Sequence, residues 1–129
     1  MTQDQDLTER FIGALAQLEE GREVEPLVAL HGDDADVGNI NVPEQFHGPD
    51  GVRRFWTEYR GTFDTMKSEF RNVIATPERI ALEWTTRGTS VEGKPVEYDG
   101  VSILEVNGNL ITRFRAYFNP RDLGRQMSS

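Results

Sequence analysis

Residues 98–119 have the sequence YDGVSILEVNGNLITRFRAYFN, in which two alternating apolar runs flank Asn107-Gly108-Asn109. Asparagine and glycine tolerate the left-handed backbone that tight hairpin turns require. The spacing therefore predicts two antiparallel strands that meet at residues 107–109. This hairpin decides the fold, because it fixes one strand pairing and one inward-facing row of side chains.

The last strand of the hairpin has one face with arginines and one face without. Because side chains alternate along a strand, the two faces carry Thr112, Phe114, Ala116 and Phe118 on one side and Ile111, Arg113, Arg115 and Tyr117 on the other. Burying two unpaired guanidinium groups costs far more free energy than exposing a tyrosine and an isoleucine. We therefore expect the row that contains the phenylalanines to point inward.

The same alternation assigns inner positions on the neighbouring strands. A strand over residues 80–90 has on its inner face Ile80, Leu82, Trp84 and Thr86. Pairing across the 107–109 turn brings to that face Ser102, Leu104 and Val106. The alternation begins near Lys67, and turns are expected at 76–78 and 92–94.

Helical patterns occupy the first half of the chain. A capping box over residues 6–9 begins a helix that apolar residues continue to Gly21, and Pro26 begins a short second helix that ends at His31. A short strand over 35–40 and a loop over 42–46 follow. The segment 48–51 opens a third helix with an apolar face made by Val52, Phe55, Trp56, Tyr59 and Phe63. Helices followed by antiparallel strands predict the α+β class.

The length and composition set further limits. The 129 residues predict a single domain over 1–129, with flexible ends at about 1–5 and 121–129. A formal net charge of -8 argues against nucleic acid as a partner. No apolar run approaches the roughly 18 residues of a membrane span, and the polar N-terminus lacks a secretory signal, so we expect a soluble, cytoplasmic protein without a membrane partner.

Several kinds of chemistry lack their motifs. There is no cysteine, which excludes thiolate nucleophiles and thiolate metal ligands. The sequence contains no glycine-rich phosphate loop, no nucleophile elbow and no histidine motif for a metal. We therefore expect neither a metal nor a cofactor.

The inner row mixes very large and very small side chains. Ser102 and Ala116 lie among Phe114, Phe118 and Trp84, which leaves more space than a close-packed core needs. One interpretation is a ligand pocket. The other is an ordinary core in which the first and third helices fill the space.

The order of the predicted elements resembles the nuclear transport factor 2-like superfamily, and its SnoaL-like bacterial branch is the most similar. The resemblance rests on ALHGDDADV at 29–37, after the second helix, and on ITRFRAYFN at 111–119. It implies a cone-shaped α+β barrel formed by a curved, mostly antiparallel sheet with three N-terminal helices. It also implies a small apolar or aromatic ligand in the open end, and a homodimer through the outer sheet face.

Members of the superfamily include ketosteroid isomerases, polyketide cyclases, epoxide hydrolases and dehydratases, so the resemblance suggests where acids and bases would lie. The isomerase positions for a tyrosine, a carboxylate base and a protonated acid correspond to Phe11, Asn39 and Ser102. The late-strand aspartate of the hydrolases and cyclases corresponds to Ala116. None of these four side chains transfers a proton as the family's mechanism requires.

Two other residues are weak candidates for acid–base catalysis. His31 has an unperturbed pKa near 6.5, but a histidine at a helix C-terminus also hydrogen-bonds the last carbonyls. Asp99 lies where a bulge turns a carboxylate to either face, and backbone amides also satisfy such an aspartate. Asn39 and Ser102 suit ligand recognition better than proton transfer.

The leading hypothesis is a protein that binds a small apolar or aromatic molecule. The pocket is expected to be lined by Phe11, His31, Asn39, Trp56, Trp84, Ser102, Phe114, Ala116 and Phe118. The alternative is an isomerase, cyclase, dehydratase or hydrolase that acts on such a compound through His31 or Asp99.

Overall fold

The structure is a computed structural model that describes residues 3–40, 46–121, 123 and 126. Its elements are α1 (Gln3–Gly21), α2 (Glu25–Val28), β1 (His31–Asn39), β2 (Phe46–His47), α3 (Gly48–Gly61), β3 (Phe63–Ala75), β4 (Arg79–Ser90), β5 (Pro95–Asn107) and β6 (Leu110–Phe118). Residues 41–45 and most of the predicted flexible tail after 121 lie outside the described residues. No helix in the described part of the chain is long and apolar enough to cross a membrane.

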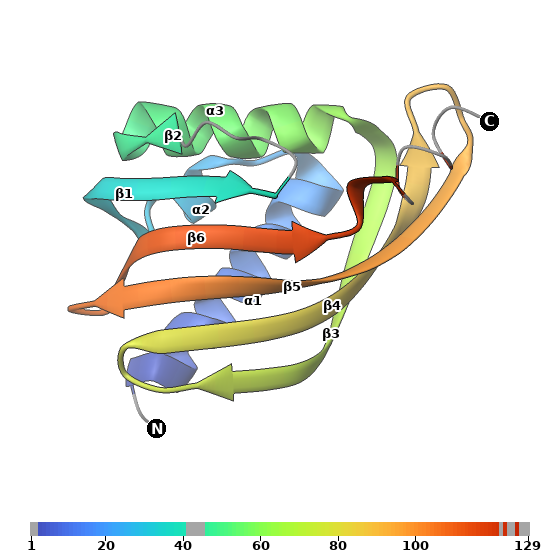
Figure 1. The fold of residues 1–129 in the computed structure, drawn as a ribbon. Coiled ribbons are helices and arrows are strands. Elements are labelled where there is room, and N and C mark those ends of the chain that lie inside the picture. The colour runs from blue at the N-terminus through green and yellow to red at the C-terminus, as the bar shows by residue number, and fades with distance from the viewer. Residues whose placement is uncertain (1–2, 41–45, 122, 124–125, 127–129) are drawn as a thin grey trace.

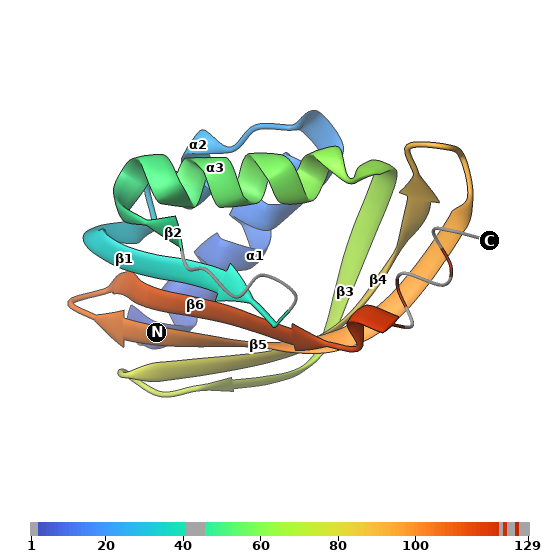
Figure 2. The same ribbon diagram turned by 45° about the horizontal axis from the view of Figure 1, so that its top comes forward.

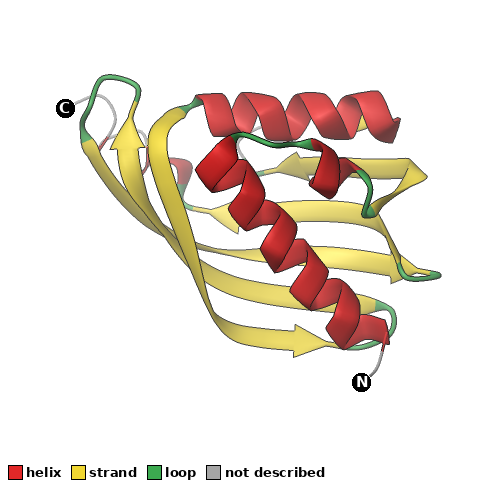
Figure 3. Cartoon of the chain, turned by 180° about the vertical axis from the view of Figure 1, so that it is seen from behind, coloured by secondary structure: helices red, strands yellow, loops and turns green. Residues whose placement is uncertain are grey.

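One curved sheet carries the helices on its concave face. The strand order is β2-β1-β6-β5-β4-β3, in which β1 pairs with β6 in parallel and the other neighbours are antiparallel. Figures 1 and 2 show α3 beside β1 and β2, at one side of the sheet. Figure 3, which views the molecule from behind, shows α1 crossing the concave face. The α+β class and the curved sheet are as predicted. The sheet is not closed into a barrel, which corrects the implied shape.

The hairpin forms where the sequence predicted it. Gly108 and Asn109 have φ of 60° and 66°, the left-handed conformation that the tight turn needs. The face assignment fails at the start of β6, because Glu105 pairs with Arg113 whereas Val106 pairs with Ile111. Thr112 is thus an extra residue in a bulge. Ile111, predicted to be exposed, is therefore fully buried, and Thr112 faces solvent.

Beyond this bulge the inner row is confirmed. Buried positions include Ile80, Leu82, Trp84, Thr86, Ser102, Leu104, Val106, Phe114 and Ala116. Several element boundaries differ from the prediction, and α2 ends at Val28 instead of His31. α1 begins at Gln3, before the expected capping box, β1 begins as early as His31, and Phe63 starts β3 instead of ending the third helix.

A buried guanidinium joins α1, α3 and β3. Arg60, near the end of α3, is 5% exposed and donates hydrogen bonds to four backbone carbonyl oxygens. Two belong to Leu18 and Glu19 at the end of α1, and two to Phe63 and Asp64 at the start of β3. A helix C-terminus leaves carbonyls without intrahelical partners and favours a cation, so this contact satisfies both needs.

Trp84 lies across Gly100 on the neighbouring strand. The two residues pair directly between β4 and β5. A Cβ at Gly100 would lie 2.4 Å and 2.5 Å from two ring carbons of Trp84 and 2.6 Å from the Tyr117 carbonyl oxygen. The absence of a side chain at position 100 therefore allows the indole to lie against the sheet.

We expect Gly100→Ala to displace the Trp84 indole and to lower the free energy of unfolding by about 1–3 kcal/mol, the usual cost of overpacking. Gly13→Ala is the matched control, because a Cβ there meets nothing within 4 Å, and alanine in a helix gains roughly 0.5–1 kcal/mol over glycine. Urea denaturation and near-ultraviolet circular dichroism measure both effects. Wild-type stability and an unchanged tryptophan spectrum in Gly100→Ala would contradict the expectation.

Candidate functional site

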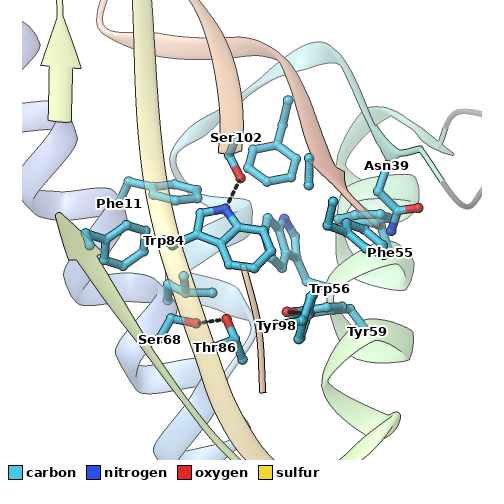
Figure 4. A pocket seen from close by; sticks show the side chains of 15 residues that line it. Phe11, Asn39, Phe55, Trp56, Tyr59, Ser68, Trp84, Thr86, Tyr98 and Ser102 are labelled. Atoms are coloured by element: carbon cyan, nitrogen blue, oxygen red, sulfur yellow. Dashed lines mark hydrogen bonds between the residues drawn. The ribbon is translucent and has the colours of Figure 1, made fainter. Parts of the chain in front are cut away.

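An inner chamber lies between the concave face of the sheet and helices α1 and α3 (Figure 4). It is lined by Phe11, Leu15, Asn39, Phe55, Trp56, Tyr59, Ser68, Phe70, Trp84, Thr86, Tyr98, Ser102, Phe114, Ala116 and Phe118. Its volume is about 40 Å³. This is space for about one or two water molecules, so aromatic side chains occupy most of the cone.

A larger vestibule of about 210 Å³ adjoins the chamber. The two cavities share four lining residues, Asn39, Phe55, Tyr59 and Phe118. The vestibule is otherwise lined mainly by residues around the end of α3, including Thr62 and Phe63. The four shared side chains therefore form the boundary between a narrow inner space and a wider outer one.

The chamber wall is an aromatic cluster. The ring of Trp56 lies 4.9 Å from that of Phe114 and 6.2 Å from that of Phe11, centroid to centroid. Trp84 packs edge to face on Tyr98 at 5.2 Å. These separations are within the range in which aromatic pairs attract, so the wall is apolar and its rings pack against one another.

The two indoles of the chamber differ in their hydrogen bonding. The Trp84 Nε1–H donates to Ser102 Oγ at 2.9 Å (Figure 4). The Trp56 Nε1–H is buried and has no acceptor among the described residues. Leaving a buried donor unpaired costs about 1–3 kcal/mol. Trp56 therefore offers an unused donor to a hydrogen-bond acceptor in the chamber.

Two tyrosines place a hydroxyl pair in the same wall. The Tyr59 and Tyr98 hydroxyl oxygens lie 2.6 Å apart. Burial raises the pKa of Tyr59 to about 12, and it raises the pKa of Tyr98 further. Both phenols therefore stay neutral at physiological pH, and each is a hydrogen-bond donor as well as an acceptor.

A second polar residue of the wall, Ser68, hydrogen-bonds a buried carboxyl group. Ser68 Oγ lies 2.7 Å from Thr86 Oγ1 and donates to Glu19 Oε2 at 2.5 Å, and the Ser68 backbone N–H donates to Glu19 Oε1 at 3.0 Å. Glu19 lies behind the wall and is 6% exposed. Desolvation raises the pKa of Glu19, and the Ser68 hydrogen bonds and the nearby Arg60 charge partly oppose that rise.

Sequence reasoning missed this polar set, although a signal for part of it was present. Glu19 follows Leu15 by four positions and Phe11 by eight, so it lies on the apolar stripe of α1. Tyr98 lies on the Ser102 face of its strand by alternation. A charged residue at a buried helical position is the kind of irregularity that marks a functional group.

The expected pocket residues are mostly gathered in the chamber. Those that line it are Phe11, Asn39, Trp56, Trp84, Ser102, Phe114, Ala116 and Phe118. His31 is the exception and does not line it, contrary to expectation. Its Nδ1–H donates to the Leu27 carbonyl oxygen at 2.7 Å, the arrangement expected of a histidine at a helix end.

Asp99 lies on the outer face of the sheet. Its carboxylate accepts a 2.5 Å hydrogen bond from Thr85 Oγ1 and lies 3.5 Å from an Arg71 nitrogen. The Thr85 hydrogen bond and the Arg71 charge lower the pKa of Asp99. Neither His31 nor Asp99 therefore reaches the chamber, and none of its lining residues is a carboxylic acid. Among the described residues, no group of three or more histidine, aspartate or glutamate side chains is placed to hold a metal ion.

We expect His31 to make stability fall in acid. Burial lowers the pKa of His31 from 6.5 to about 4, so between these values the unfolded chain binds a proton that the folded chain does not. Stability is thus lost as pH falls from 6.5 towards 4, by about 3 kcal/mol. Urea denaturation at several pH values measures it, and His31→Gln removes this part of the loss.

His47→Gln is the matched control. Asp36 raises the pKa of the exposed His47, through a hydrogen bond and its charge, so the stability from that pair is present at low pH and lost as pH rises. The control therefore keeps the acid loss that His31 causes. Equal acid loss in His31→Gln and wild type would contradict the assignment.

Comparisons with known proteins agree with the fold. None of the curated proteins compared matches the chain. A Burkholderia pseudomallei protein of unknown function, described as nuclear transport factor 2-like, superposes with a TM-score of 0.87 at 18% identity, over 100% of both chains. TerC, co-crystallised with polyporic acid, gives 0.81 at 17% identity, over 95% of this chain and 98% of that chain.

An epoxide hydrolase of Mycobacterium tuberculosis, described as LEH-like, gives a TM-score of 0.72 at 17% identity, over 95% of this chain and 86% of that chain. At these identities the likeness shows the fold alone. The profile of the SnoaL-like domain matches residues 9–114. Because that match spans most of the sequence, the chain belongs to the SnoaL-like domain family.

Proposed function

We propose that this protein binds a small aromatic molecule that carries a hydrogen-bond acceptor, such as an aryl ketone. The observation that carries the proposal is the buried Trp56 Nε1–H, which has no acceptor among the described residues and belongs to a chamber walled by aromatic rings. A ligand acceptor at this donor recovers the cost of leaving it unpaired. The aromatic walls favour a planar apolar body beside it.

The sizes of the two cavities suggest how such a ligand is placed. A dry cavity of about 150 Å³ is known to hold benzene. The vestibule of about 210 Å³ is large enough for an aromatic ring, whereas the chamber of about 40 Å³ is not. The ring therefore occupies the vestibule, and the acceptor group passes the boundary at Phe55 and Phe118 to reach Trp56.

Binding is favoured over catalysis by the positions of the candidate acids and bases. His31 bonds the Leu27 carbonyl, and Asp99 lies on the outer face of the sheet, so the enzyme alternative loses both of its residues. The structurally similar TerC was co-crystallised with polyporic acid, which supports ligand binding by this fold.

We expect the wild-type protein to bind 2-acetylnaphthalene more tightly than 2-ethylnaphthalene, which has nearly the same shape but no acceptor. Trp56→Phe keeps an aromatic ring and removes the N–H, so it should weaken binding of the ketone about five-fold, as for the loss of one hydrogen bond of about 1 kcal/mol, and leave the hydrocarbon unchanged. Intrinsic fluorescence reports both titrations, because Trp56 and Trp84 are the two tryptophans and both line the chamber.

Trp84→Phe is the matched control. Its N–H already donates to Ser102, so its loss should not distinguish the ketone from the hydrocarbon. Failure of both compounds to bind the wild type, or an equal effect of Trp56→Phe on both, would contradict the proposed function.

We also propose that two copies pair through the outer sheet face. Val101 and Tyr117 lie opposite each other on β5 and β6 and are 37% and 45% exposed. Arg71 and Arg113 on the same face are paired with Asp99 and Glu105, so those carboxylates add little to the repulsion between two chains of formal charge -8. A second copy of this apolar and charged surface is therefore the proposed partner.

We expect a solution mass of twice 14.6 kDa for the wild type by light scattering, and a shift to monomer in Val101→Glu, which places an unpaired charge in the contact. Val91→Glu is the control, because Val91 is 68% exposed near the β4–β5 turn, away from that contact. A monomeric wild type, or a Val101→Glu dimer as stable as the wild type, would refute the pairing.

A further inference from the structure

The vestibule combines aromatic side chains with a carboxylate. Its aromatic lining residues are Phe46, Phe55, Tyr59, Phe63 and Phe118. Glu58 also lines it, and within the described part of the chain no lysine, arginine or histidine does. The Glu58 side chain is 57% exposed, so its carboxylate lies at the rim, where the vestibule meets solvent. Aromatic rings inside and a negative charge at the rim are the combination that favours an organic cation.

A cation of the protein itself already uses two of these groups. The Arg54 Nε–H donates to Glu58 Oε2 at 2.7 Å. The guanidinium carbon of Arg54 also lies 5.5 Å from the centre of the Phe46 ring, within the range of cation–π attraction. Arg54 does not line the vestibule, and its side chain is 69% exposed. A guanidinium outside the vestibule therefore contacts a carboxylate and a ring that a ligand cation inside it would also meet.

The other oxygen of Glu58 is available to a ligand. Among the described residues, no group donates a hydrogen bond to Glu58 Oε1. Arg54 competes only weakly with a ligand cation, because solvent screens an exposed ion pair. The buried Arg60, near the same end of α3, does not compete, because its guanidinium bonds backbone carbonyl oxygens of α1 and β3.

An organic cation fits this rim better than a metal ion. Calcium takes six to eight oxygen ligands, whereas the vestibule lining contains a single carboxylate. An alkylated ammonium group needs no such shell, and aromatic rings attract it directly. The formal net charge of -8 also favours the approach of a positively charged ligand.

We propose that the rim of the vestibule binds a positively charged ammonium group, which makes the ligand an aryl ketone with an amine at the end of the ring remote from the ketone. The order of the groups follows the cavities: the Trp56 donor lies in the chamber, the ring lies in the vestibule, and Glu58 lies at the rim. This inference rests on the proposed function, because that function places the ketone at Trp56.

Two ligands of the same shape test the charge. In 4-neopentylacetophenone a carbon replaces the charged nitrogen of (4-acetylbenzyl)trimethylammonium, which keeps its charge at every pH. The measured quantity is the ratio of the cation's affinity to the neutral compound's affinity, by intrinsic fluorescence. At low ionic strength, we expect Glu58→Gln to lower this ratio about five-fold relative to the wild type, the effect of one exposed ion pair. Added salt should lower the ratio in the wild type more than in Glu58→Gln.

Two further variants identify the source of the effect. Arg54→Gln removes the competing cation and should raise the ratio. Glu9→Gln is the matched control and should keep the wild-type ratio. Glu9 is also an exposed helical glutamate, but it lies in the first half of α1, which begins at the opposite side of the molecule from the end of α3 (Figure 3). An unchanged ratio in Glu58→Gln, or an equal fall in Glu9→Gln, would overturn the inference.

Tetramethylammonium chloride tests the rim without an aryl ketone. We expect the amide NMR signals of Glu58, Tyr59 and Thr62 to shift saturably with this salt, and not with sodium chloride at the same concentration. The saturable shift should be lost in Glu58→Gln. Equal shifts with both salts, or the same shift in Glu58→Gln, would refute the ammonium site.

The two experiments separate this inference from the proposed function. If neither ketone binds the wild type, the proposed function fails, and the tetramethylammonium titration alone decides the ammonium site. If both ketones bind with the same ratio in the wild type and Glu58→Gln, the ammonium site is refuted and ligand binding stands.

Discussion

The buried guanidinium of Arg60 is the contact on which the arrangement around the cavity depends. By bonding carbonyls of Leu18, Glu19, Phe63 and Asp64, it holds the end of α1 against the junction of α3 and β3. These elements carry Glu19, Tyr59 and Ser68, so the same contact fixes the geometry of the polar wall. Because the Arg60 guanidinium is engaged by backbone oxygens, it forms no ion pair with the nearby Glu19 carboxylate and acts on it only through its charge. Desolvation is therefore the largest influence on the pKa of Glu19.

The cavity combines an apolar wall with a few polar groups that have distinct roles. Trp84 is satisfied by Ser102 and is a fixed part of the wall, whereas Trp56 retains an unused donor. Tyr59 and Tyr98 share a hydrogen bond in which either hydroxyl can be the donor. Phe11, Asn39 and Ser102, which the resemblance predicts to stand at the acid and base positions of the isomerases, line the chamber, and none of them is a carboxylic acid.

The hairpin and the inner row could be predicted because alternation and turn chemistry are local properties of the sequence. The burial of Ile111 could not, because a bulge adds one residue and reverses the alternation beyond it. Most of the predicted lining residues surround the chamber, because alternation assigns them to the inner face, although aromatic side chains fill most of the space there. His31 was predicted to line the pocket but does not, because its ring donates a hydrogen bond to the Leu27 carbonyl, one helical turn back. The contacts of Glu19, Ser68 and Thr86 join three elements that are distant in sequence, and local patterns carry no information about such a combination.

The position of β6 in the sheet has a consequence for how the chain folds. This strand is the last of the described strands, yet it lies between β1 and β5 and links the N-terminal half of the described chain to the antiparallel strands. Until residues 110–118 leave the ribosome, β1 has no sheet partner except the two-residue β2. The earlier elements must therefore wait with an unpaired strand edge, and closure of the concave face is a late, long-range step of folding.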